Sequence, residues 1–144
     1  MTASRSNQEE RLYKQYRNKA PEDICVFCDV KEGHPQFVEQ TRFFKIIRNR
    51  FPYSIWDGLG VNDHLMAVPK KHVSSLSELP DQAGIEYLQL LSKYERAHYN
   101  LYARAPSSNI KSIMHQHTHL LQLDNRKKRI IFLVTKPFYR RLSI

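Results

Sequence analysis

The stretch His115-Gln116-His117-Thr118-His119-Leu120-Leu121 places three histidines at alternate positions near the C-terminal end of the chain. Alternate side chains of an extended strand point to the same face of a sheet, so the three imidazoles should form a row. The flanking segments Ser112-Ile113-Met114 and Leu120-Leu121 indicate a partly buried strand over residues 111–123. Such a row of imidazoles can attack an electrophile, donate hydrogen bonds or bind a metal ion.

Length and composition indicate one globular domain, since the chain has 144 residues and is 41% hydrophobic. We expect a cytoplasmic protein without membrane association, because no apolar run could span a bilayer and residues 1–10 lack the apolar core of a signal peptide. Lysine and arginine outnumber aspartate and glutamate by 23 to 14, a net charge of +9 that attracts polyanions such as nucleotides or RNA. The basic run Arg126-Lys127-Lys128-Arg129 fits either a solvated surface or an RNA-binding patch.

The hydrophobic pattern predicts an α+β fold, with a mainly antiparallel sheet and one long helix. Apolar residues recur at helical spacing from Pro80 to Leu101. The Ser-x-x-Glu pattern at Ser6–Glu9 predicts a helical N-terminal arm within residues 1–20, and residues 21–144 should form a single domain with a basic C-terminal strand and tail. The expected strands are residues 36–40, 42–48, 64–68, 111–123 and 129–135.

Cys25 and Cys28 are the only cysteines of the chain. Their two-residue spacing, in a chain without a secretion signal, favours metal binding or redox chemistry over a structural disulfide. Redox chemistry is the weaker hypothesis, because no thioredoxin-like βαβ pattern surrounds the pair.

Four motifs in the same order resemble those of the histidine triad (HIT) family, in its zinc-containing branch. They are Cys25-Val26-Phe27-Cys28, Asn49-Arg50-Phe51-Pro52-Tyr53, the segment from Asp63 to His72 and the three-histidine run, and together they span about residues 24–123. The resemblance implies a HIT-like fold and a homodimer formed through the long helix and an edge strand. It also implies a nucleotide hydrolase or nucleotidyltransferase that acts on dinucleoside polyphosphates or nucleotide phosphoramidates.

The resemblance also assigns roles to single residues. His117 would attack the α-phosphorus and form a nucleotidyl-histidine intermediate, and His119 would donate a hydrogen bond to the phosphate. Ser112 would assist the leaving group, although it also fits a plain hydroxyl at the start of a strand. Asn49 would reach the ribose, although it also fits a residue that only holds the turn before Pro52.

By the same resemblance, Cys25, Cys28, His72 and His115 would bind a structural zinc ion, with His64 as the substitute for His72. Two thiolates and two imidazoles suit tetrahedral zinc, and four protein ligands close its coordination sphere. The alternative is a pair of buried free thiols with His72 at the surface.

Ile110-Lys111 departs from the family pattern, which has Gly-Gln before the serine. Lys111 would bind the phosphate as a point charge rather than through a directed amide. This departure and the positive charge leave a second hypothesis open, a zinc-stabilised nucleotide- or RNA-binding module with little or no catalysis. Nucleic acid is the less favoured partner.

Overall fold

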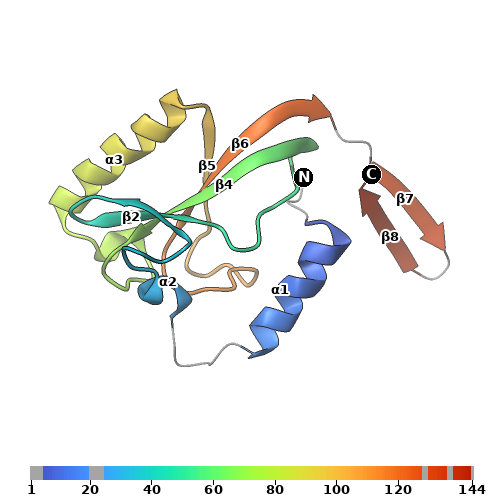
Figure 1. The fold of residues 1–144 in the computed structure, drawn as a ribbon, viewed down its shortest axis with the longest axis horizontal. Coiled ribbons are helices and arrows are strands. Elements are labelled where there is room, and N and C mark those ends of the chain that lie inside the picture. The colour runs from blue at the N-terminus through green and yellow to red at the C-terminus, as the bar shows by residue number, and fades with distance from the viewer. Residues whose placement is uncertain (1–4, 20–24, 128–129, 136–137, 144) are drawn as a thin grey trace.

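The computed structural model describes residues 5–19, 25–127, 130–135 and 138–143. The core is an antiparallel sheet in the order β1-β2-β4-β6-β5, with the short β3 paired to β4 (Figure 1). The predicted α+β class with a mainly antiparallel sheet is confirmed. The strands of this sheet are β1 Phe37–Gln40, β2 Phe44–Arg48, β3 Ile55–Trp56, β4 Leu59–Pro69, β5 Tyr99–Ala103 and β6 Thr118–Lys127.

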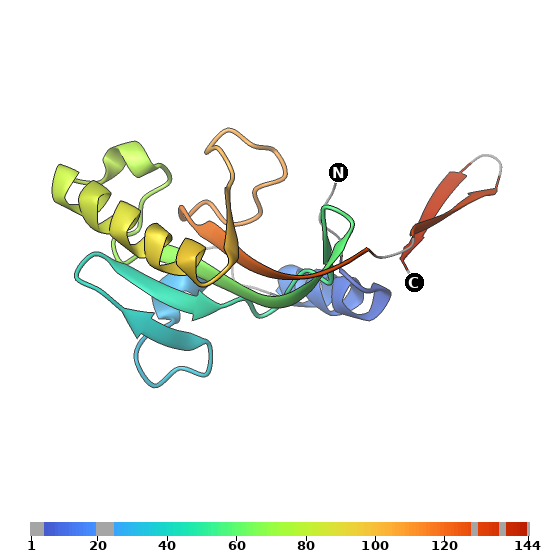
Figure 2. The ribbon, with the colours of Figure 1, turned by 90° about the horizontal axis from the view of Figure 1, so that it is seen from above.

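Helix α3, Asp81–Arg96, covers one face of the sheet (Figures 1 and 2). Its buried residues Ala83, Leu90 and Tyr94 pack against alternate residues of the central strands, which form the larger core. The strand residues of this core are Phe44, Ile46, Leu65, Ala67 and Leu120.

The opposite face is covered by the short helix α2, Val26–Asp29. Phe27 and Val30 pack there against Ile47, Met66 and Val68. Both faces of β2 and β4 are therefore buried, which explains the nearly continuous apolar runs in these strands. The odd-numbered side of β6 and the even-numbered side of β4 face α2, so His119 lies on this second face.

The long helix is confirmed, but its predicted continuation to Leu101 is wrong. Helix α3 ends at Arg96, and His98 turns the chain with a positive φ of 65°. The next five residues form β5, which pairs with β6 from Tyr99↔Gln122 to Ala103↔Thr118. Pairing with a neighbouring strand overrides the local helical spacing, since a strand edge supplies backbone partners that the sequence pattern does not reveal.

The predicted strand over 111–123 also needs correction. The strand begins only at Thr118, so His119 lies on β6 while His115 and His117 lie in the segment that precedes it. Strand β4 is longer than the predicted 64–68 and begins at Leu59. Asp57 and Gly58, both with positive φ, form the tight turn that joins it to β3.

The N-terminal helix α1, Asn7–Lys19, has the predicted capping box. Ser6 N–H donates to the Glu9 carboxylate, and Glu9 N–H donates to Ser6 Oγ. The helix lies on the other side of the β4–β6 pair from α3 (Figure 1). Its Tyr13 and Tyr16 rings contact Phe51, with ring centroids 5.6 and 5.2 Å apart.

The C-terminal segment forms a separate hairpin of β7, Ile130–Thr135, and β8, Phe138–Ser143. It extends beyond the end of β6 in both ribbon views (Figures 1 and 2). The sequence pattern predicted only the first of these strands. Within the predicted basic run, residues 128 and 129 lie outside the described residues, whereas Arg126 and Lys127 are exposed at the end of β6.

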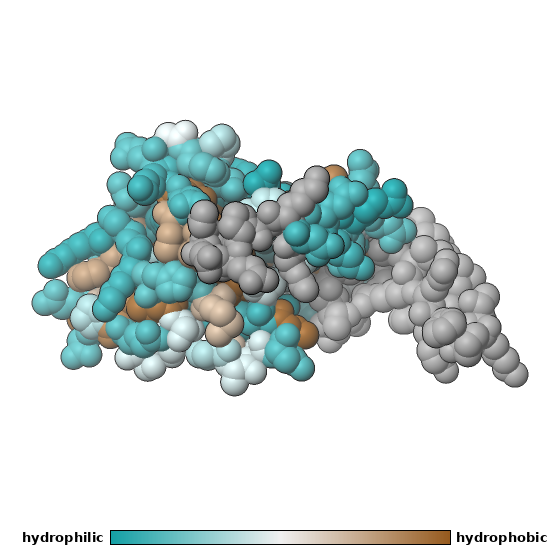
Figure 3. All heavy atoms as spheres, turned by 90° about the horizontal axis from the view of Figure 1, so that it is seen from below, coloured by the Kyte–Doolittle hydropathy of each residue, from teal (hydrophilic) through white to brown (hydrophobic). Residues whose placement is uncertain are grey.

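Among the described residues, none of the helices has the length and apolar character needed to cross a membrane. The face shown in Figure 3 is mostly hydrophilic where it is not drawn in grey, with apolar residues scattered over it.

Candidate active site and metal centre

A cavity of about 940 Å³ opens on the α2 side of the sheet. Four of the residues predicted to act on a substrate line it: His117, His119, Ser112 and Asn49. The volume is near the upper end of the range typical of small-molecule sites, roughly 300–1,000 Å³. The structure thus brings together, from three separate segments, residues that the sequence motifs had singled out.

His117 is held by its own backbone segment. Its Nδ1 lies 2.8 Å from the His115 carbonyl oxygen, and because a carbonyl only accepts, Nδ1 must carry the hydrogen. The lone pair is then on Nε2. The ring is flanked by Phe27 and His119, at centroid distances of 5.0 and 4.9 Å. The geometry therefore gives His117 the tautomer that a nucleophile requires.

His119 is oriented by His64. The Tyr53 backbone N–H donates to His64 Nδ1 at 3.1 Å, so the His64 hydrogen is on Nε2. That Nε2–H donates to His119 Nδ1, 2.9 Å away. His119 consequently carries its own hydrogen on Nε2, as a donor. One backbone amide thus sets the tautomers of two histidines in succession.

Burial keeps these imidazoles neutral. It lowers the pKa of His64 to about 3, and the charges of Arg5 and His117 add to the effect. Burial also holds the pKa of His119 well below its usual range. The pKa of His117 is lowered mainly by burial, against the opposing effect of its hydrogen bond to His115. At neutral pH the site therefore presents uncharged rings.

Asn49 directly follows β2, and its Oδ1 accepts the Phe51 N–H at 2.9 Å, while its Nδ2 donates to His64 Nδ1 at 3.4 Å. The side chain holds the turn and also lines the cavity, so its contact with a ribose stays a prediction. Ser112 is exposed at the edge of the cavity.

Lys111 does not line the cavity. It is buried, and its Nζ donates to Gln116 Oε1 at 2.7 Å and to the Ser74 carbonyl at 3.1 Å. Its charge nevertheless contributes to the lowered pKa of His117. Lys111, which departs from the family pattern, is therefore paired with Gln116, the residue between the first two histidines of the run.

Cys25, Cys28, His72 and His115 form a cluster whose ligand atoms all lie within 4.8 Å of one another. Cys25 Sγ is 3.3 Å from His115 Nδ1, and Cys28 Sγ is 3.4 Å from His72 Nδ1. A tetrahedral ion with bonds of about 2.3 Å to sulfur and about 2.0 Å to nitrogen spaces its ligands roughly 3.5 Å apart. The group could hold a metal ion.

The ring of His115 is also anchored in the way that metal-binding histidines require. Its Nε2 lies 2.9 Å from the Pro69 carbonyl oxygen, so Nε2 carries the hydrogen and Nδ1 is left as a ligand atom. Burial, followed by the nearby Cys25 thiol, raises the pKa of Cys28. A bound cation would offset this effect, because metal ligation favours the deprotonated form of a thiol.

Solved structures with the same fold include a HIT family hydrolase from Legionella pneumophila Philadelphia 1, at 22% identity and a TM-score of 0.52, with 72% of this chain and 95% of that chain covered. A HIT family hydrolase from Clostridium thermocellum matches at 18% identity and a TM-score of 0.54, over 78% of this chain and all of the other. A hypothetical protein from Leishmania major matches at 25% identity and a TM-score of 0.55, over 79% of this chain and 84% of the other. No protein-family profile and no curated protein matches the sequence.

This chain has the histidine triad fold.

On the histidine triad fold, the structure adds residues to the site that the sequence motifs did not assign. His64, expected only as a substitute metal ligand, instead orients His119. Arg5 of the N-terminal arm lines the cavity, as does Trp56 of β3. No sequence pattern links these positions to the three-histidine run, because their proximity arises from strand pairing and from the docking of α1.

Proposed function

We propose that the chain is a nucleotidyl hydrolase or nucleotidyltransferase that acts through a nucleotidyl-His117 intermediate. His117 Nε2 attacks the α-phosphorus of a nucleotide, a P–N bond forms, and the bond from phosphorus to the leaving group breaks. The leaving group departs with the electron pair. Water or another acceptor then attacks the phosphorus, which releases the nucleotide and returns the electron pair to His117.

The observation that carries this proposal is the anchoring of His117. Its Nδ1–H is held by the His115 carbonyl, while the ring lines an open cavity of nucleotide size. Burial lowers its pKa, so the ring is neutral and nucleophilic at pH 7 without help from a separate base.

The neighbouring groups fit the charge that develops on phosphate oxygens. His119 offers an Nε2–H whose direction is set by His64, and a fixed donor stabilises a developing negative charge more than a mobile one. Asn49 contacts the ribose and Ser112 the leaving group. Lys111 does not line the cavity, because its ammonium group is hydrogen-bonded to Gln116. Its positive charge acts on the site from behind the lining residues.

We further propose that the Cys25-Cys28-His72-His115 cluster holds zinc. Two sulfur and two nitrogen donors favour zinc over harder cations, and four protein ligands leave no position for a substrate. The ion would therefore be structural, joining α2 to the segment before β6 and leaving the chemistry to His117 and His119.

A homodimer formed through α3 and β5 is also part of this proposal. Ile85 and Leu88 of α3 are 62% and 66% exposed, and Leu101 lies on β5 at the edge of the sheet. Large apolar side chains on an edge strand and its neighbouring helix suit association with a second copy.

His117→Asn tests the proposed function. We expect kcat/KM for a dinucleoside polyphosphate and for a nucleoside phosphoramidate to fall by roughly 10³-fold or more, because the variant lacks the nucleophile. Mass spectrometry of acid-quenched protein should find a nucleotidyl adduct on the wild type but not on the variant. His98→Asn is the matched control, since His98 is exposed and asparagine tolerates its positive φ.

Full turnover by His117→Asn would refute the mechanism. Nucleotide binding without turnover by the wild type would instead favour the binding-module hypothesis. RNA binding that weakens steeply with salt, and is lost when Arg126 and Lys127 are neutralised, would identify RNA as the ligand of that module.

A further inference from the structure

The cavity has two aromatic regions, one at each end of the His117–His119 pair. Phe27 contacts the His117 ring at 5.0 Å. At the other end, Tyr53 and Tyr102 contact the His119 ring at centroid distances of 5.7 and 6.0 Å. A single nucleotide attached to His117 occupies one of these regions, which leaves the other for a different part of the substrate.

The second region is built around Trp56, which contacts both tyrosines. Its ring centroid is 5.8 Å from that of Tyr53 and 4.8 Å from that of Tyr102. Trp56 is placed there by the β3–β4 turn at Asp57 and Gly58. Trp56 and Tyr102 are only partly buried and both line the cavity, so their rings are accessible to a flat ligand.

Helix α1 closes this region from the side. The Arg5 guanidinium lies between two rings, 4.2 Å from the centroid of Tyr13 and 4.9 Å from that of Tyr53. Its Nε donates to the Phe51 carbonyl at 3.0 Å. Arg5 and Tyr13 both line the cavity, so the N-terminal arm forms part of its wall.

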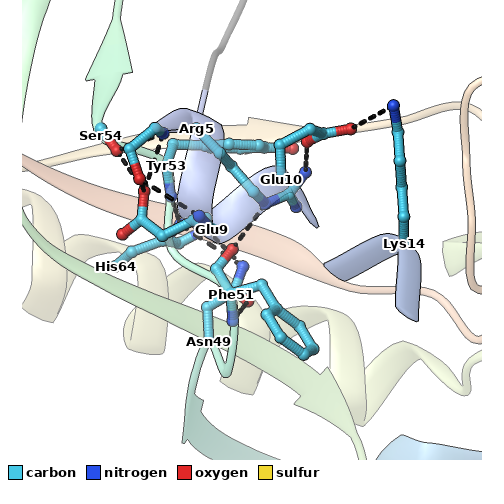
Figure 4. A network of polar contacts seen from close by, with 10 residues as sticks. Arg5, Glu9, Glu10, Lys14, Asn49, Phe51, Tyr53, Ser54 and His64 are labelled. Carbon is cyan, nitrogen blue, oxygen red and sulfur yellow. Dashed lines mark hydrogen bonds and ion pairs between the residues drawn. The ribbon is translucent and has the colours of Figure 1, made fainter. Parts of the chain in front are cut away.

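A polar network fixes the arm in this position (Figure 4). The Glu9 carboxylate accepts from Ser6 and from Ser54 Oγ, and Arg5 pairs with Glu10 at 3.5 Å. Figure 4 shows Arg5 and Glu9 directed toward the segment that carries Phe51 and Ser54, and the Tyr53 N–H of that segment donates to His64 Nδ1. The arm and the catalytic histidines are therefore connected through one short loop.

The charge of Arg5 also reaches the histidines. It contributes to the lowered pKa of His64 and of His119. A guanidinium group at this point attracts the phosphate chain that leads from the α-phosphorus to the leaving group.

We propose that Tyr53, Trp56 and Tyr102, closed by Arg5 just before α1 and by Tyr13 of α1, form a subsite for an aromatic leaving group, namely the second nucleoside of a dinucleoside polyphosphate. The base stacks on the Trp56 side, and the polyphosphate lies along Arg5. In the chemical step the P–N bond forms at His117 while the bridging P–O bond breaks, and the released nucleotide keeps the electron pair. This inference rests on the proposed function and specifies which of its two substrate classes the cavity selects.

The test compares two substrates that differ only in their leaving group, a dinucleoside tetraphosphate and the phosphoramidate of the same nucleoside. We expect Trp56→Leu and Tyr13→Ala each to lower the ratio of kcat/KM for the dinucleoside to that for the phosphoramidate by about tenfold, mainly through KM, since one base stacked on aromatic rings accounts for an effect of this size. Leu12→Ala is the control on the same helix, because Leu12 is 49% exposed and does not line the cavity.

The outcomes separate the two proposals. Wild-type protein that turns over neither substrate overturns the proposed function, and the subsite with it. Wild-type protein that turns over the phosphoramidate, with both variants keeping the original ratio, overturns the subsite alone. Circular dichroism and melting temperature of each variant identify a loss of fold, and since Trp56 and Tyr13 lie on different elements, a fold defect in one leaves the other as the test.

Discussion

His115 and His117 are two residues apart, yet they belong to regions with opposite properties. His115 donates from Nε2 to the Pro69 carbonyl and directs Nδ1 at Cys25 Sγ. His117 donates from Nδ1 to the His115 carbonyl and keeps Nε2 for the cavity. In each ring, one N–H donates to a backbone carbonyl, and this hydrogen bond determines which nitrogen keeps its lone pair. The two rings therefore offer their lone pairs to different surroundings.

The two regions also differ in what completes them. The four-ligand cluster is closed by its own side chains, whereas the cavity is lined from α1, α2, the 49–57 segment and the segment before β6. Substitutions should therefore separate them, with stability responding in the first region and turnover in the second.

The largest expected effect on the fold comes from the proposed metal site, Cys25, Cys28, His72 and His115. Cys28→Ser should abolish metal binding and lower the melting temperature by more than about 10 °C, because a structural site contributes its binding free energy to folding. Metal analysis of the wild type should find about one zinc per chain. Equal melting temperatures and equal metal content for wild type and variant would contradict a structural metal ion, and His98→Asn should match the wild type in both.

A smaller effect, on turnover, is expected at the cavity lined by His117 and His119. His64→Gln should lower kcat by roughly tenfold or more with little change in KM, because His119 loses its orientation but keeps its N–H, and a positioned donor contributes about 10²–10⁴ in total. Metal content should remain that of the wild type. A change in KM alone would show that His64 acts on binding rather than on the transition state.

Acid should lower the free energy of unfolding of the chain through His64. Because burial lowers the folded-state pKa of His64 to about 3, the unfolded chain binds a proton near pH 6.5 that the folded chain does not. Stability is then full above pH 6.5 and is lost as pH falls toward 3, by about 2 kcal/mol between pH 6.5 and 5. Urea unfolding at several pH values should show a shallower pH dependence for His64→Gln than for His98→Asn.

The smallest expected effect lies outside both regions. Leu88→Glu should convert the dimer to a monomer, because it places a charge on an exposed apolar face of α3. Sedimentation measures the change in mass. Metal content should be unaffected, since the four ligands belong to one chain; a wild type that is already monomeric would remove the dimer from the proposal.

The elements of the fold that the sequence predicted correctly are those that depend on local patterns. The capping box at Ser6, the helical repeat after Pro80 and the β-branched strand 42–48 appear where expected, since each depends on neighbouring residues. The ends of elements were predicted less well. Residues 99–103 fit a helical repeat, but they form β5 because β6 offers them a backbone ladder.

The sequence by itself determined the residue types of both regions, since motif order singled out the four cluster residues and the three-histidine run. Tertiary structure decided which nitrogen of each ring is free, that His64 contacts His119 rather than the Cys25-Cys28-His72-His115 group, and that α1 forms a wall of the cavity. The physical reason is distance along the chain. Hydrogen bonds between residues 55 positions apart, such as His64 and His119, depend on strand register and burial, which no local pattern encodes.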